Sequence, residues 1–337
     1  NLVDAPLVTG TLLNNNGTLT ALTRVAVIGQ SPPANTLTIN AGAASARIDL
    51  DGTGESGVVN INRNQALDIN GTLSDAFNGT MTMAQNTTLD ISSAWTLGAG
   101  GVITVDNGLA PGIPPIPGGP SFIAGGALTQ TGGTILITDI DGALNFDVPF
   151  TMSGGTLTNH GLVNFNRDTT IAAGANFNLA SPAADFAVGL GATVTINQTN
   201  FDLDGPNGGI TNIAVDEIGH LIINSSDYDL DPGANGFDGA INLNNGDITV
   251  QTADARFVMN GVLQMHSSIE GRITVWSGQP IDIGNDLVST AQLIVTGTRT
   301  SRFGSAVRFR SDAVVSVATG ATLDFNNVVT FEPVGLA

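Results

Sequence analysis

One twelve-residue segment has the residue types and the spacing of a calcium loop. It reads DYDLDPGANGFD and covers residues 227–238. Its oxygen-bearing side chains, at loop positions 1, 3, 5, 9 and 12, are those of Asp227, Asp229, Asp231, Asn235 and Asp238. EF-hand-type loops use this spacing to wrap several oxygen donors around one hard cation. The segment therefore predicts a calcium site with these five residues as ligands.

The same segment departs from the EF-hand pattern at two positions. Pro232 stands where the pattern has Gly, and Asp238 stands where it has a bidentate Glu. No flanking helices are indicated. The chain has 29 acidic residues, of which four are Glu, so Asp is common in it. A polar turn is thus the alternative to a calcium site.

Three further segments of the form DxDG each place two carboxylates two residues apart. They cover residues 49–52, 139–142 and 202–205. In a strand, the two acids of each segment would lie on one face. There they could bind a cation, or serve as the carboxylate pair of a glycoside hydrolase or a lyase. The alternative is a turn that ends a strand, and the wide separation of the three segments argues against one shared pocket.

Four of the ten basic residues fall within twelve positions near the end of the chain: Arg299, Arg302, Arg308 and Arg310. This arginine cluster could bind an acidic polysaccharide or meet an acidic surface on a neighbouring subunit. The alternative is a solvated face.

The remaining residues that could do chemistry are scattered along the chain. The histidines are far apart and form no HExxH or HxH motif; they are His160, His220 and His266. No GxSxG segment signals a nucleophile elbow. Three aromatic side chains could stack on sugars, although packing in the core or at corners is the more common use of Trp: Trp95, Trp276 and Tyr228.

Composition limits the classes of protein that can use these residues. Cys and Lys are both absent, which excludes disulfides, thiolate sites, Schiff-base chemistry and a P-loop lysine. The net charge is −19, so we expect no binding to nucleic acid. No apolar stretch reaches the roughly 20 residues that a membrane helix needs, so no direct membrane insertion is expected.

Short alternating runs bounded by Gly, Asn or Asp fill most of the sequence. Examples are NTLTIN, GTMTM, GGTILI, GATVTIN and QLIVTG, each with the period of two that is typical of a half-buried strand. No window has the apolar stripe and the caps of a helix; STAQLIV is the nearest. Two all-β folds fit this spacing, tandem β-sandwiches and a β-solenoid. Repeated phrases and few paired Asn-Gly hairpin turns favour the solenoid, with corner Asn and Thr linking adjacent coils.

One segment interrupts the pattern of strands. Residues 108–122 contain five of the fourteen prolines, and proline cannot donate to a strand ladder. We predict a loop inserted into a single β-solenoid domain that spans residues 1–337. A joint between two domains is the alternative.

The phrases GGTLTNHGLVNF, IAAGANFNL, GGTILI and VATGATLDF carry a resemblance that covers most of the chain. They resemble the passenger domains of bacterial autotransporters and related surface-exposed β-helix adhesins. This resemblance implies a right-handed parallel β-helix that is secreted or attached to a cell surface. The membrane barrel of autotransporters is not found in the sequence, so the secretion route stays open.

The functional expectation is an extracellular, non-enzymatic structural or adhesive protein that forms a rigid rod. Its partners would be further copies of itself, in a filament or surface layer, or a cell-surface polysaccharide, with calcium as the expected cofactor. The alternative is a polysaccharide lyase or glycoside hydrolase on the same fold.

Overall fold

The computed structural model consists of short parallel strands, and no helix occurs in the part of the chain that it describes. The backbone is described for residues 7–8, 10–14, 18–20, 24–28, 35–41, 47–50, 57–61, 63–106, 120–181, 184–198, 201, 212–215, 220–223, 240–244, 247–250, 257–259, 262–267, 271–275, 281–283, 292–298, 300–309 and 313–332. Side chains are described mainly within 57–106, 120–201 and 292–332. The chain divides into two compact units, one of residues 1–168 with 174–176 and one of residues 169–173 with 177–337.

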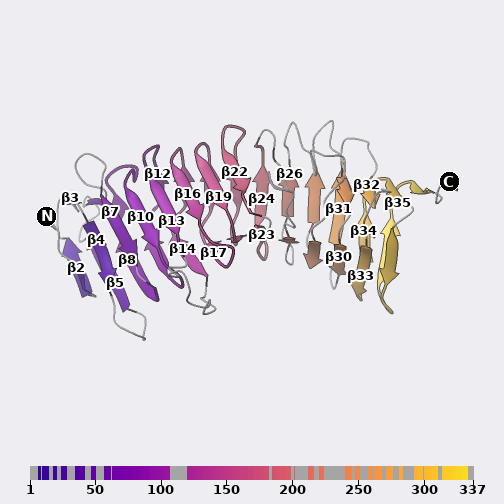
Figure 1. The fold of residues 1–337 in the computed structure, drawn as a ribbon, viewed down its shortest axis with the longest axis horizontal. Helices are drawn as coiled ribbons and strands as arrows, with labels where there is room; N and C mark the ends of the chain where they lie inside the picture. Colours follow the sequence, from indigo (N-terminus) through magenta and orange to yellow (C-terminus); the bar gives the residue numbers. More distant parts are fainter. Residues whose placement is uncertain are drawn as a thin grey trace. The chain divides into compact units, whose positions relative to one another are not determined.

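The first unit is a stack of coils, each of which contributes strands to three faces (Figure 1). On the first face lie β1 (Leu7–Val8), β4 (Arg24–Ile28), β7 (Val58–Ile61), β10 (Thr80–Met83), β13 (Val102–Val105), β16 (Thr134–Ile137) and β19 (Thr156–Asn159). On the second lie β2 (Gly10–Asn14), β5 (Asn35–Ala41), β8 (Gln65–Asn70), β11 (Thr88–Ile91), β14 (Ser121–Gly125), β17 (Ala143–Phe146) and β20 (Leu162–Phe165). The third holds two separate sheets: one is β3 (Thr18–Thr20), β6 (Arg47–Asp49) and β9 (Thr72–Leu73), and the other begins with β12 (Trp95–Leu97), β15 (Leu128–Gln130) and β18 (Phe150–Met152).

The second unit has the same construction. One series of paired strands is β21 (Thr169–Ile171), β24 (Thr193–Ile196), β26 (His220–Ile223), β28 (Asp247–Val250), β31 (Gly271–Val275), β34 (Thr300–Phe303) and β37 (Thr322–Phe325). Another is β23 (Asp185–Val188), β25 (Asn212–Val215), β27 (Ala240–Asn244), β30 (Val262–Ser267), β33 (Gln292–Gly297) and β36 (Val314–Val317). The third is β29 (Phe257–Met259), β32 (Ile281–Ile283), β35 (Val307–Phe309) and β38 (Val329–Phe331), while β22 (Asn176–Leu179) straddles the unit boundary.

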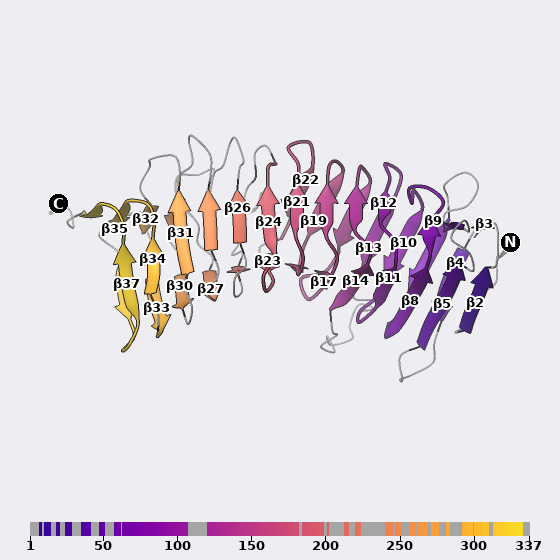
Figure 2. The same cartoon turned by 180° about the vertical axis from the view of Figure 1, so that it is seen from behind.

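Parallel pairing between adjacent coils settles the fold class. Met81 pairs with Val59 of the preceding coil and with Ile103 of the following one, and both pairings are parallel. Figure 2 shows the same succession on the second face, where β5, β8, β11, β14 and β17 follow one another. The predicted all-β fold, a parallel β-helix or β-solenoid, is confirmed, and the tandem β-sandwich alternative is wrong.

The period of two puts alternate side chains inside the stack. In β10, Met81 and Met83 are buried whereas Thr80 is exposed. Because strands pair in register, inward residues of successive coils lie over one another and form apolar columns. A coil cannot cover its own apolar residues, so each coil depends on its neighbours for burial.

Phenylalanine rings fill part of the interior of the first unit. The ring of Phe146 stacks at 4.5 Å from that of Phe150 and at 5.6 Å from that of Phe165, centroid to centroid. All three side chains are fully buried. Such contacts add about 0.5–1.5 kcal/mol per pair beyond the burial of area.

Amide side chains link adjacent coils, as the sequence predicted for asparagine. Asn64 and Asn86 occupy equivalent turns and both have positive φ, 60° and 54°. Asn86 Nδ2 donates to Asn64 Oδ1 at 2.8 Å. Further along the first unit, Asn164 Nδ2 donates to Asn145 Oδ1, and Asn166 Nδ2 donates to Asp147 Oδ1 at 2.7 Å.

Most of the proline-rich segment lies outside the described residues. The structure resumes at Pro120, and Ser121 and Phe122 already belong to β14, so the last two residues of the predicted loop are in a strand. Thr87 Oγ1 donates to Ser121 Oγ at 3.1 Å across 34 residues, whereas Asn64 and Asn86 are 22 residues apart. The longer coil accommodates the segment between β13 and β14.

Candidate functional site

The predicted calcium loop cannot be placed, because Asp227, Asp229, Asp231, Asn235 and Asp238 all lie outside the described residues. They belong to the connection between β26, which ends at Ile223, and β27, which begins at Ala240. The calcium site therefore stays a prediction. Within the described part of the chain, no group of three or more His, Asp or Glu side chains is arranged to hold a metal ion.

One DxDG segment, residues 139–142, is described in full and forms a turn between β16 and β17. Asp141 N donates to Asp139 Oδ1 at 3.4 Å, and Gly142 N donates to Asp139 O at 2.9 Å. Gly142 O accepts from Leu162 N of the next coil. In the segment 49–52, Asp49 ends β6, and residues 51–52 and 202–205 lie outside the described residues. The described segment therefore has the geometry of a strand-connecting turn.

The three histidines and Trp95 lie far apart in the structure and form no common site. His160 is half-buried in a turn, His220 is exposed in β26, and His266 lies in β30. Trp95 is buried, as predicted, and its Nε1 has no hydrogen-bond partner in the structure. Trp276 and Tyr228 lie outside the described residues.

Two members of the arginine cluster are described, and both form ion pairs with the last coil. Arg302 Nε lies 3.1 Å from Asp324 Oδ2, and Arg308 Nη1 lies 3.5 Å from Glu332 Oε1. The side chains of both pairs are partly exposed, between 30% and 42%. Arg299 and Arg310 lie outside the described residues. Two members of the arginine cluster therefore have their acidic partners within the same chain.

An acidic pair that the sequence analysis missed lies on the second face of the first unit. Asp68 of β8 and Asp90 of β11 are directly opposite each other in parallel strands. Burial and the neighbouring Asp68 carboxylate both raise the pKa of Asp90 above its ordinary value of 3.8. Asn70 Nδ2 donates to Asp68 Oδ2 at 3.4 Å. The related phrases ALDIN and TLDIS contained the signal, since equal positions in equal phrases lie side by side in a solenoid.

A glycine on the next coil makes room for this pair. Gly125 of β14 has φ +95°, and a Cβ there would lie 2.5 Å from Asp90 Oδ1 and 2.2 Å from Ile91 O. Only glycine tolerates both the conformation and the close approach. Residues 68, 90 and 125 therefore form a small acidic surface in which one carboxyl holds its proton more tightly than usual.

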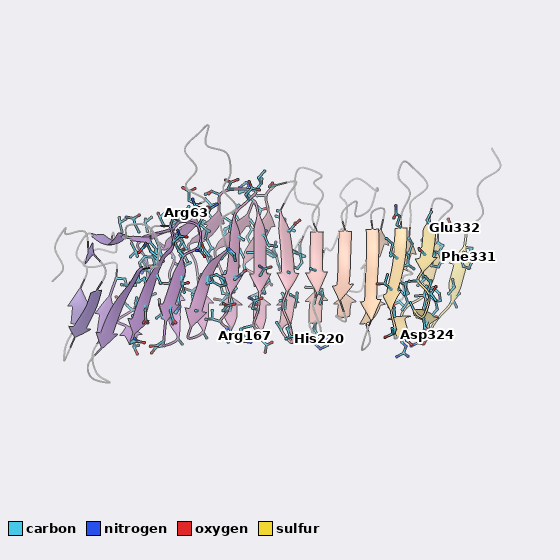
Figure 3. All side chains as sticks on the ribbon, turned by 90° about the horizontal axis from the view of Figure 1, so that it is seen from below. Arg63, Arg167, His220, Asp324, Phe331 and Glu332 are labelled. Atoms are coloured by element: carbon cyan, nitrogen blue, oxygen red, sulfur yellow. The ribbon has the colours of Figure 1, made fainter. Side chains whose placement is uncertain are left out.

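The last coil of the second unit, formed by β36, β37 and β38, exposes apolar side chains. Val315 and Val317 follow Leu293 and Val295 in their columns, yet they are 42% and 46% exposed whereas their partners are fully buried. Phe331, labelled in Figure 3, stacks at 5.2 Å on buried Phe309 and is 71% exposed. Asp324 and Glu332 lie on opposite sides of this coil (Figure 3). Alternation alone would have buried Val315, Val317 and Phe331, and their exposure follows from the absence of a further coil above them among the described residues.

Comparison with known proteins adds no relative to these observations: the chain matches no family model, no curated protein and no solved structure. Among the described residues, no helix is long and apolar enough to span a membrane.

Proposed function

We propose that this chain is an extracellular structural or adhesive protein in which stacked β-coils act as a stiff scaffold. The observation that carries the proposal is the coupling of each coil to the next. Apolar columns, ring stacks such as Phe146 on Phe165, and amide contacts such as Asn164 with Asn145 all connect adjacent coils. A stack coupled in this way resists bending and local opening, which are the demands on a scaffold.

The outward positions of the coils support a role in contact rather than in chemistry. On the third face of the first unit, the central outward residues are Thr96, Thr129 and Thr151, which follow one another in register. Hydroxyl and amide groups spaced along a face can bind the hydroxyl groups of a polysaccharide. We propose a cell-surface polysaccharide, or further copies of the chain, as the partner, and a secreted or surface-attached location of the autotransporter-passenger or adhesin type.

Calcium remains part of this proposal through residues 227–238. Five oxygen-bearing side chains at the spacing of a calcium loop would supply the ligands of the ion. Isothermal titration with calcium, repeated on the variant Asp229→Asn plus Asp231→Asn, tests this role. Equal heats for both proteins would remove calcium from the proposal.

A panel of neutral and acidic polysaccharides tests the main proposal. The protein is incubated with each polymer, and both retention on the immobilised polymer and release of reducing ends or unsaturated products are measured. Retention without products supports the scaffold and adhesive function. Products at a rate that depends on protein concentration would overturn it.

A glycoside hydrolase or lyase is the second candidate, and the acidic pair is the observation that favours it. Two carboxylates on adjacent coils, one with a raised pKa, match the acid and base that such enzymes need. If the panel yields products, Asp90→Asn should abolish them while Asp75→Asn, at an exposed position on the same coil as Asp68, should not. Product formation that survives Asp90→Asn would place the chemistry elsewhere.

A further inference from the structure

We propose that the first face of the first unit binds the surface of ice. The part of this face that carries the proposal consists of the parallel strands β7, β10, β13, β16 and β19, which follow one another in Figure 1. This inference goes beyond the proposed structural function, because it names a further ligand and the surface that takes it.

The outward side chains of these five strands form two rows, which we call the threonine lattice. Every pairing between neighbouring strands is parallel and one-to-one, so each strand adds one residue to each row. The first row is Val58, Thr80, Val102, Thr134 and Thr156, and the second is Asn60, Thr82, Thr104, Leu136 and Thr158. Neighbours along a row lie about 4.8 Å apart, and the two rows lie about 6.6 Å apart. The face therefore presents hydroxyl and methyl groups at regular intervals in two directions.

The hydroxyl groups of the threonine lattice are available to water. All six of its threonines are half-buried or exposed, and none of their hydroxyls forms a hydrogen bond with another described residue. Threonines at corners differ: Thr131 Oγ1 donates to Leu97 O at 3.3 Å, and Thr138 Oγ1 donates to Val105 O at 3.1 Å. The corner hydroxyls thus link adjacent coils, whereas those of the lattice do not contribute to the stack in this way.

The side chains of the threonine lattice are stiff. Six are Thr and two are Val, and β-branching restricts the χ1 angle of each. The positions of their hydroxyl and methyl groups are therefore set by the backbone of the coils. Little side-chain entropy is lost when such a surface binds an ordered partner.

The threonine lattice carries no charge, although the chain has a net charge of −19. The second face of the same unit, by contrast, holds Asp68 and Asp90. The lattice has no aromatic ring either, and such rings are the usual platform for sugars. Its complementary partner is therefore uncharged and hydrogen-bonding, and it repeats at the interval of the coils.

Ice has these properties. Its oxygen atoms repeat along one crystal axis at nearly the spacing of adjacent coils. Water bound to a row of hydroxyls therefore takes positions close to those of the crystal. Water beside the methyl groups keeps its hydrogen bonds to other water molecules, since a methyl group offers none. The threonine lattice thus orders a layer of water that an ice surface can incorporate.

The main test grows a single ice crystal slowly from a solution of the full chain. The protein should be enriched in the ice relative to the remaining liquid, and a seeded crystal should freeze at a lower temperature than it melts. Thr104→Lys, in the middle of the threonine lattice, should abolish both effects, because ice does not accommodate an ion. Thr88→Lys places the same charge on a half-buried outward threonine of β11, on the second face, and should leave both effects unchanged.

Several results would overturn the inference. One is exclusion of the parent chain from ice, and another is an equal loss of enrichment in the two variants. Crystalline cellulose and chitin are the alternative ordered surfaces. Binding to either that Thr104→Lys removes, without enrichment of the parent chain in ice, would assign the lattice to a polysaccharide instead. Circular dichroism and thermal unfolding establish that both variants are folded. The panel of dissolved polysaccharides does not involve ice, so failure of this inference and failure of the proposed function are distinguishable.

Discussion

The covered coils of the first unit and the terminal coil of the second unit are built from the same strand pattern and differ in what lies above them. In β17 and β20, inward Phe146 and Phe165 are fully buried between coils. In β36 and β38, inward Val317 and Phe331 are exposed, although their partners one coil below are buried. Burial in this fold is therefore a property of the stack, not of the individual strand.

This difference assigns different tasks to equal residues. An apolar side chain between two coils contributes to stability through both neighbours, whereas the same side chain on the last described coil packs on one neighbour only. The substitutions below measure how far the two regions differ.

The largest difference is expected for phenylalanine. Phe146→Ala removes a ring that stacks on two others, so it should lower the free energy of unfolding by about 3–5 kcal/mol. Phe331→Ala removes a ring that is already 71% exposed and should cost below about 1 kcal/mol in the monomer. Urea unfolding followed by circular dichroism measures both. Stacked coils can unfold in parts, so amide exchange of β17 and β38 serves as the local readout. Similar losses in both variants would contradict the comparison.

Two glycines with similar positive φ offer a second comparison, with a smaller expected effect on stability. Gly125 and Gly320 have φ of +95° and +90°, so alanine is strained at both positions. At Gly125 a Cβ would also meet Ile91 O at 2.2 Å, whereas at Gly320 it would meet no atom within 4 Å. Gly320→Ala should therefore cost about 1 kcal/mol, the strain alone, and Gly125→Ala about 1–3 kcal/mol more. Thermal unfolding of the two variants side by side gives the difference, and equal shifts would mean that the neighbouring coil yields.

The sequence was sufficient to predict the coils because their physical cause is local. Alternation in segments such as TMTM, and Gly or Asn at turns, define strands and corners without long-range information. In STAQLIV, the nearest helix candidate, the last four residues begin strand β33, where inward Leu293 and Val295 pack in a column. The same residues would suit one turn of helix, and the pairing with β30 decides between the two.

The candidate sites were harder to predict because they depend on register between coils. Asp68 and Asp90 are 22 positions apart and become neighbours only when the length of the coil is known. Likewise, nothing near Arg302 in the sequence indicates that Asp324 is its partner. The calcium loop is a local pattern and could be read directly, but its residues lie outside the described part of the chain.

The ion pair between Asp324 of the terminal coil and Arg302 of the coil below should contribute little to stability. Arg302→Gln removes the ion pair with Asp324 and should cost about 0.2–1 kcal/mol, because both side chains are partly solvated. Raising the salt concentration should shrink the difference between the variant and the parent protein. Thermal unfolding at low and high salt checks both statements, and a loss that does not depend on salt would point to packing of the arginine stem.

In the covered coils, by contrast, two like charges lie side by side, those of Asp68 and Asp90. Removing one of them should therefore raise the stability of the fold, not lower it. The pKa of Asp90 is raised, so the folded chain binds this proton more tightly than the unfolded chain does. The resulting stabilisation is complete below the unfolded pKa, near 3.8, and is lost as the pH rises through the higher folded pKa. At neutral pH, Asp90→Asn should therefore stabilise the fold, by about a few tenths of a kcal/mol because Asp90 is only half-buried.

The pH profile distinguishes this repulsion from a simple change of packing. Unfolding free energies of the parent chain and of Asp90→Asn are measured from neutral pH down to pH 4. The difference between them should shrink towards acid, since protonation removes in the parent the same charge that the variant lacks. Asp106→Asn, at an exposed position elsewhere in the first unit, serves as the control for the overall acidity of the chain. A difference that stays constant over this range would mean that Asp68 and Asp90 do not repel each other in the fold, and that stacking places like charges together at no cost.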